Sequence, residues 1–145
     1  MPVNNLDFSN QVSTWVAKTE KRMEAVMRAS VQELVSRCQA RIPVDTGFAR
    51  ASIQASLSDM PQIVPDSRPQ PGGSYAPTNA VPVVIAQMKL GDTIHIGWTA
   101  SYVIYLEYGH SQQAPSGFVR VSALEWPQIV SEMSQTAEAR AAGGP

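Results

Sequence analysis

The sequence has few charged residues and only one cysteine. Charged side chains make up 16% of the 145 residues and hydrophobic ones 43%, whereas about a quarter of the residues in a typical soluble domain are charged. A surface with so little charge suggests that partner proteins cover part of it. The lone Cys38 excludes an internal disulfide and a cysteine-rich metal site, and it fits a reducing compartment.

Other absences narrow the function further. The net charge of −1 gives no overall attraction to nucleic acid. No apolar run approaches the roughly 18 residues of a membrane span, and residues 1–5 lack the regions of a signal peptide, so we expect a soluble cytosolic protein without membrane contact. His95 and His110 are the only histidines, and Gly72-Gly73 lies among prolines rather than in a phosphate loop. We therefore expect neither a metal nor a cofactor.

Glycine and proline are missing between Val3 and Arg41, which allows one long helix over about Phe8 to Ala40. Its apolar residues recur at helical spacing and are Val12, Trp15, Val16, Met23, Val26, Met27, Leu34, Val35 and Cys38. At 1.5 Å per residue the helix would be roughly 50 Å long. We expect its centre to cover a sheet and one end to project toward a neighbouring subunit. Met23 and Met27 could adapt to an interface, but packing in the core is the simpler interpretation.

The helical pattern stops at Ile42-Pro43-Val44-Asp45-Thr46-Gly47. Pro43 cannot continue a helix, and Gly47 can adopt a positive φ without steric cost. Asp45 and Thr46 can bond nearby backbone N–H groups. This stretch predicts a tight corner that leads directly into the first strand.

Two segments alternate polar and apolar residues with the period of a strand, namely 52–58 and 93–99. Residues 81–90 predict a short helix, although Val83-Val84-Ile85 would also suit a strand. Residues 101–109 favour a helix over a strand. Residues 118–139 predict a final helix with a kink at Pro127, and 139–145 a flexible tail.

Residues 59–79 contain five of the 11 prolines and few residues able to build a core. A loop this long is usually functional or disordered. We expect a projecting or disordered loop that orders, if at all, against a partner.

The whole chain, 1–145, is expected to form a single α+β domain, with the two long helices packed on a small antiparallel sheet.

The residues alone leave two functions open besides a purely structural one, a protease and a nucleic-acid-binding protein. Asp45-Thr46-Gly47 is the triplet of aspartic proteases, and a dimer could supply the paired carboxylates, although that fold is all-β and here the triplet follows a long helix. Six basic residues lie on the first helix, interleaved with glutamates, and could bind nucleic acid: Lys18, Lys21, Arg22, Arg28, Arg37 and Arg41.

The motifs of this sequence follow one another in an order that resembles a known protein family. A long helix is followed by Ile-Pro-Val-Asp-Thr-Gly-x-x-Arg-x-Ser-Ile, a strand ending in Trp, Tyr-x-x-Tyr-Leu-Glu-x-Gly, and Ala-Pro-x-x-Phe-Val-Arg before a last helix. Over about Val31 to Ala137, outside the proline-rich loop, this order resembles the tail-completion or head–tail joining proteins of long-tailed bacteriophages. The resemblance implies a non-enzymatic virion protein that assembles in the host cytoplasm into a ring, with a hexamer as the expected form. Its expected partners are further copies of itself, the tail-tube protein and a head-side connector or stopper, with DNA only passing through the lumen.

In that setting one group of residues would shape and brace the turns, with Arg50 as an ionic partner of Glu107: Pro43, Asp45, Thr46, Gly47, Arg50, Glu107 and Gly109. Large apolar and tyrosine side chains suit interfaces between subunits. The candidate interface residues are Trp15, Met23, Met27, Tyr102, Tyr105, Tyr108 and Phe118.

Overall fold

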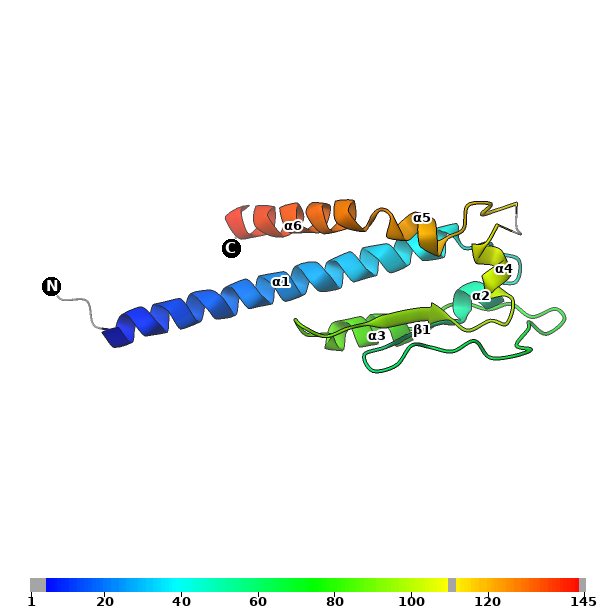
Figure 1. Ribbon diagram of the computed structural model, residues 1–145, viewed down its shortest axis with the longest axis horizontal. Helices are drawn as coiled ribbons and strands as arrows, with labels where there is room; N and C mark the ends of the chain where they lie inside the picture. Colours follow the sequence, from blue (N-terminus) through cyan, green and yellow to red (C-terminus); the bar gives the residue numbers. More distant parts are fainter. Residues whose placement is uncertain (1–4, 110–111, 144–145) are drawn as a thin grey trace.

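The chain folds as an α+β protein in which one long helix runs along the whole molecule (Figure 1). The computed structural model describes residues 5–109 and 112–143. A small sheet and several short helices lie on one side of the long helix, and the C-terminal helix lies on the other. This arrangement confirms the predicted α+β class with its long N-terminal helix, C-terminal helix and small antiparallel sheet, but the C-terminal helix packs on the long helix and not on the sheet. His110 lies outside the described residues.

Helix α1 covers Asn5–Arg41, which confirms the long helix. Its 37 residues correspond to about 56 Å at 1.5 Å per residue. Only the C-terminal part is buried, beginning at Ser30 and Val31. The N-terminal part extends beyond the rest of the molecule (Figure 1), so the predicted projecting end is present.

The sheet has two antiparallel strands, β1 (Ile53–Ser56) and β2 (His95–Trp98), and both are shorter than the alternating patterns predicted. The register pairs Ile53 with Trp98 and Ser56 with His95. Ile53 is buried while the next residue, Gln54, is exposed. The alternation in the sequence therefore places one face of β1 on the core.

Helix α3 covers Ala80–Gln87, so the helix prediction is confirmed and the strand alternative is wrong. Val81 and Ile85, one helical turn apart, are buried. Pro82 lies in the first turn, where its missing N–H interrupts no helical hydrogen bond. The preferred helix after β2 is also present, as α4 (Val103–Glu107).

The C-terminal region forms two helices, α5 (Val119–Ala123) and α6 (Trp126–Gly143), rather than one kinked helix. The break falls at Leu124 and Glu125, and Pro127 lies in the first turn of α6, a position that tolerates proline. Helix α6 continues to Gly143, so the described part of the predicted tail is helical. Its flexibility stays a prediction.

The core joins α1, the sheet and the short helices around two aromatic rings. Phe118 is 1% exposed, and its ring meets that of Trp98 edge-on, with the centroids 5.0 Å apart. The buried hydrophobic cluster consists of Val31, Val35, Cys38, Ile42, Ala49, Ile53, Val81, Ile85, Met88, Trp98, Ala100, Val103 and Phe118.

The proline-rich loop 59–79 contains no helix or strand but is bonded to the rest of the chain. The Val64 N–H donates to the Thr99 carbonyl at 2.8 Å, and the Ser101 hydroxyl donates to the Ser67 carbonyl at 2.6 Å. The Tyr75 N–H donates to the Thr46 carbonyl at 3.1 Å. The expectation that this loop projects and orders only against a partner is therefore wrong for these segments.

Candidate functional site

The corner after α1 is a packed turn that binds other parts of the chain. The Thr46 hydroxyl accepts a hydrogen bond from the Phe48 N–H at 3.2 Å. Gly47 has a φ of 85°, and a Cβ at this position would collide with the carbonyl oxygen of Tyr75. Glycine is thus required here both by the backbone conformation and by the proline-rich loop lying against it.

The corner differs from its prediction in two respects. It leads into a four-residue helix, α2 (Phe48–Ala51), before β1 begins. Asp45 is exposed, and no hydrogen bond or ion pair joins its carboxylate to another described residue, so Thr46 holds the turn instead. Pro43, in contrast, is buried. The two-stranded, largely helical fold is not the all-β fold expected for an aspartic protease.

Glu107 braces the start of α5. Its carboxylate accepts hydrogen bonds from the N–H groups of Phe118 and Val119, each at 2.8 Å, and from the N–H of Arg120 at 2.9 Å. The Arg120 side chain adds an ion pair at 3.0 Å and donates to the Glu107 carbonyl at 2.7 Å. Burial alone would raise the pKa of Glu107, but these backbone and arginine donors outweigh it and lower the pKa.

The expected pairing of Arg50 with Glu107 is therefore wrong, because Arg120 occupies that place. The Arg50 carbonyl accepts a hydrogen bond from the Gln39 amide at 3.0 Å, and its buried Nε has no partner among the described residues. Gly109 has a φ of 84°, and a Cβ there would collide with the Pro115 carbonyl oxygen. Gly109 thus allows the chain after α4 to turn tightly.

A second brace fastens α1 to the junction of α5 and α6. Arg41 binds both carboxylate oxygens of Glu125, one of them at 3.0 Å, and donates to the Ser122 hydroxyl at 2.9 Å. This hydrogen bonding lowers the pKa of Glu125. Arg37 reaches Glu33 at 3.0 Å and α6 through Glu132 at 3.4 Å.

These ion pairs also bear on the nucleic-acid hypothesis. Arg28 pairs with Glu24 at 2.7 Å and donates to the Met88 carbonyl at 2.8 Å. Together with Arg37 and Arg41, half of the six basic residues on α1 are thus engaged within the chain. The rest, Lys18, Lys21 and Arg22, are exposed on the projecting part of the helix.

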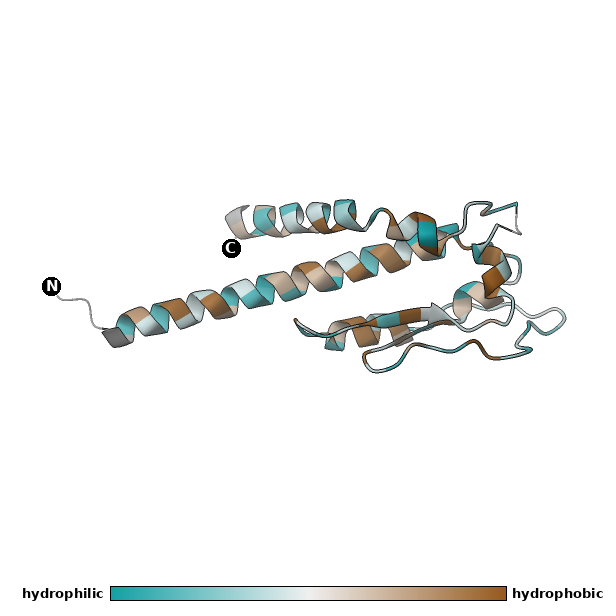
Figure 2. Cartoon of the chain, viewed as in Figure 1, coloured by the Kyte–Doolittle hydropathy of each residue, from teal (hydrophilic) through white to brown (hydrophobic). Residues whose placement is uncertain are grey.

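The exposed apolar residues of α1 form the surface that stands out most. Trp15 is 67% exposed, Phe8 60% and Met23 52%, so the assignment of Met23 and Met27 to the core is wrong. Figure 2 shows brown apolar bands continuing along the projecting part of α1. We call this surface the projecting stripe, made of Phe8, Val12, Trp15, Val16, Met23 and Met27.

The other candidate interface residues divide between surface and core. Tyr105 and Tyr108 are 62% and 63% exposed, and the Arg120 guanidinium lies over the Tyr108 ring at 4.8 Å. Tyr102 is partly buried and stacks on Phe48, with the centroids 6.3 Å apart. Phe118 is a core residue of the single chain and leaves the set of interface candidates.

Sequence reasoning missed the residues that complete these sites. Arg120 belongs to the Phe-Val-Arg motif, but nothing local indicates that it pairs with Glu107. Tyr75 and Gln113 lie in loops, where the Gln113 amide oxygen accepts from the Val44 N–H at 2.9 Å. Among residues 5–109 and 112–143, no three His, Cys, Asp or Glu side chains gather as a metal site, and no helix is long and apolar enough to cross a membrane.

The sequence that forms the long helix, the glycine corner and α4 matches a known protein family. Residues 7–109 match the family described as "Bacteriophage HK97-gp10, putative tail-component". The chain belongs to this family. The matched part of this tail component runs from the start of α1 to Gly109, so it includes the proline-rich loop and ends before α5 and α6. No curated protein and no solved structure gives a significant match.

Proposed function

We propose that this tail component is a structural subunit of the phage neck, a tail-completion or tail-terminator protein that forms a ring and joins the tail tube to the head connector. The observation that carries the proposal is the projecting stripe. A helix whose apolar side chains are 38–67% exposed over twenty residues loses the favourable burial of those side chains unless another chain covers them.

Ring formation places particular demands on a subunit. A ring requires two different surfaces that meet head to tail, because a surface that binds its own copy closes as a dimer. The chain carries exposed apolar side chains at both ends, the projecting stripe at one and Tyr105 and Tyr108 of the α4 region near the other (Figure 1), so its contacts with neighbours need not be self-complementary. Aromatic residues and methionine are enriched in the cores of such interfaces.

The expected partners follow from the place of the ring. Further copies of the chain would complete it, with six-fold symmetry as the expectation that matches a tail tube. The tail-tube protein and a head-side connector or stopper would contact its two faces. The net charge of −1 suits a lumen through which DNA passes, since a strongly basic lining would retain phosphate. Assembly would take place in the host cytoplasm, and the ring would remain in the virion.

The proposal is tested in a lysate of the encoding phage whose gene for this chain carries a stop codon. Electron microscopy should then show heads and tails that accumulate separately, and adding the purified protein should restore joined particles. Joined, infectious particles in the unsupplemented lysate would overturn the proposed function. Adding an unrelated protein of similar size to the same lysate is the control.

A further inference from the structure

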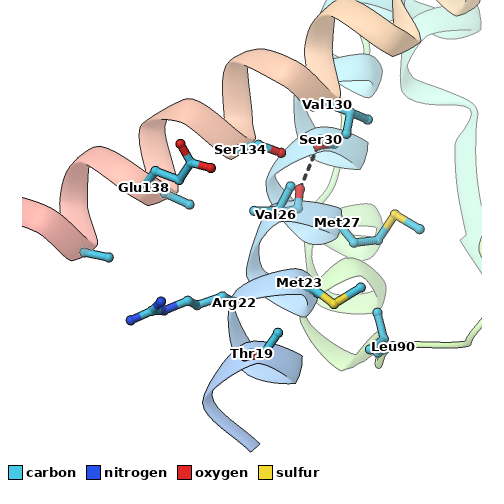
Figure 3. A pocket seen from close by; sticks show the side chains of 12 residues that line it. Thr19, Arg22, Met23, Val26, Met27, Ser30, Leu90, Val130, Ser134 and Glu138 are labelled. Atoms are coloured by element: carbon cyan, nitrogen blue, oxygen red, sulfur yellow. Dashed lines mark hydrogen bonds between the residues drawn. The ribbon is translucent and has the colours of Figure 1, made fainter. Parts of the chain in front are cut away.

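Helices α1 and α6 flank an open groove that includes Met23 and Met27 of the projecting stripe. The groove has a volume of about 500 Å³, far more than the space of a single water, so several large side chains fit in it. Figure 3 shows Val130 beside Ser30 at one end, and Arg22 and Glu138 at the other, where the two helices diverge. We call it the α1–α6 groove; α1 lines it from Thr19 to Ser30, α6 lines it from Val130 to Ala141, and Leu90 adds a third side.

The two walls of the groove have the spacing of helix faces. On α1 the lining residues run from Thr19 to Ser30, and on α6 from Val130 to Ala141. Each wall therefore includes twelve residues, whose first and last Cα atoms lie about 16 Å apart along the helix axis. Beyond Val130 the α6 wall consists of Ser134, Ala137, Glu138 and Ala141. Apart from Glu138 these side chains are small, which leaves room for large side chains from outside.

The first turns of α1 carry a matching set of large side chains. Phe8, Val12 and Trp15 follow one another at i, i+4 and i+7 and are all exposed, which is the anchor spacing of a helix that binds in a groove. They span about 10 Å along the helix axis, which fits within the groove. Asp7 and Lys18 are the only charges from residue 7 to residue 18.

We propose that residues 7–18 of α1 from one copy dock in the α1–α6 groove of the next copy, with Phe8, Val12 and Trp15 as the anchors. This inference rests on the proposed ring and names its contact. The occupant is a second copy because the same chain carries both the unfilled groove and the unpartnered anchors. One positive and one negative charge flank each surface, Arg22 and Glu138 on the groove and Asp7 and Lys18 on the segment, so no net repulsion opposes docking.

The docking surfaces do not overlap, which determines the type of assembly. The anchors lie on residues 8–15, whereas the groove begins at Thr19 and includes α6. Each copy can therefore donate its segment to one neighbour and accept a segment from another. Such a contact is heterologous and can close into a ring. A symmetric pairing of two α1 helices through the stripe alone would make a dimer instead.

Cross-linking distinguishes these contacts. Trp15→Cys in one preparation and Ala137→Cys in another are mixed and oxidised, with Ala139→Cys, on the opposite side of α6, as the matched control. Because a disulfide requires Cβ atoms about 4 Å apart, the Trp15→Cys and Ala137→Cys mixture should give at least about tenfold more mixed covalent dimer than the control mixture. The native Cys38 is buried and should not compete. Equal yields, or covalent dimer mainly in Trp15→Cys alone, would overturn the proposal.

Substitutions test the same contact without a cross-linking reaction. Trp15→Glu should abolish self-association measured by light scattering, whereas Ser13→Glu, with the same charge on the other side of α1, should not. Ala137→Glu should also abolish it, and mixing the two defective proteins should restore a one-to-one complex, since each retains one intact surface. Circular dichroism checks that both variants remain folded.

The outcomes separate this inference from the proposed function. Rings that persist in both Trp15→Glu and Ala137→Glu would overturn the docking contact and leave the neck function standing. Wild-type protein that stays monomeric at the highest attainable concentration, together with no cross-link in the Trp15→Cys and Ala137→Cys mixture, would overturn the contact as well. Loss of head–tail joining on gene interruption, measured separately, decides the function itself.

Discussion

Replacing Glu107 by Gln removes the negative charge that holds the start of α5. In the wild type one carboxylate oxygen accepts the Phe118 and Val119 N–H groups, and the other accepts the N–H and Nε–H of Arg120. Glutamine keeps one acceptor oxygen. Its NH₂ group replaces the other oxygen and faces two N–H groups, from which it cannot accept a hydrogen bond. The chain then loses its charge-assisted hydrogen bonds to Glu107 and its ion pair with Arg120.

The expected loss of stability follows from the exposure of these groups. A hydrogen bond to a charged group contributes about 1.5–3 kcal/mol when buried. The Glu107 side chain is only 15% exposed, but that of Arg120 is 55% exposed, so water replaces part of what is lost. We expect E107Q to lower the free energy of unfolding by about 2 kcal/mol, or the melting temperature by about 6 °C for a chain of this size.

The effect should also depend on pH. The pKa of Glu107 is lowered from 4.5 in the folded chain, so its charge stabilises the fold above that value and ceases to do so as the pH falls through the lower folded-state pKa. The difference between wild type and E107Q should be full at pH 7 and shrink below about pH 4.5. Urea unfolding followed by circular dichroism at several pH values measures it.

The matched control is Glu20→Gln, which changes an exposed glutamate on the projecting part of α1. Its effect should stay within about 0.5 kcal/mol at every pH. A loss of less than about 0.5 kcal/mol for E107Q at pH 7 would refute the assignment of Glu107 as a brace. A larger loss that does not change with pH would refute the role given to its charge.

Three further outcomes are expected. Gly47→Ala should cost about 2–3 kcal/mol in urea unfolding, because alanine disfavours a positive φ and its Cβ would collide with Tyr75; a neutral effect would contradict the reading of the corner. Arg41→Met should speed hydrogen exchange in α5 and α6 more than in β1 and β2, because it releases Glu125 and Ser122; uniform acceleration would contradict this. At a concentration where the wild type is monomeric, Trp15→Glu should leave the unfolding free energy within about 0.5 kcal/mol of wild type, because Trp15 is exposed in the single chain; marked destabilisation would place it in the core.

The sequence predicts the elements whose causes are local. The absence of glycine and proline up to Arg41 accounts for α1. Alternating residues account for β1 and β2, and the combination of Pro82 with helical spacing accounts for α3. For α1 the neighbouring residues are sufficient, whereas for residues 81–87 they leave a strand open, and the burial of Val81 and Ile85 on one face agrees with the helix. The four-residue α2 is too short to leave such a pattern.

Contacts between distant segments could not be predicted in this way. Arg50 and Arg120 are both plausible partners for Glu107 in the sequence, and only the position of α5 selects Arg120. Phe118 is an aromatic residue of the kind enriched at interfaces, yet the start of α5 lies close to the end of β2, and Phe118 is buried against Trp98. Met23 and Met27 follow the same helical stripe as the core residues, and their exposure depends on where α6 diverges from α1.

The location of the chain in assembled phage tests the central claim most directly. Virions of the encoding phage are labelled with an antibody against this protein and viewed by electron microscopy. A ring-forming subunit that joins tube to connector predicts label at the head-proximal end of the tail on every joined particle. Label along the tail or at its distal tip, or mature virions that carry none of the protein, would contradict the account.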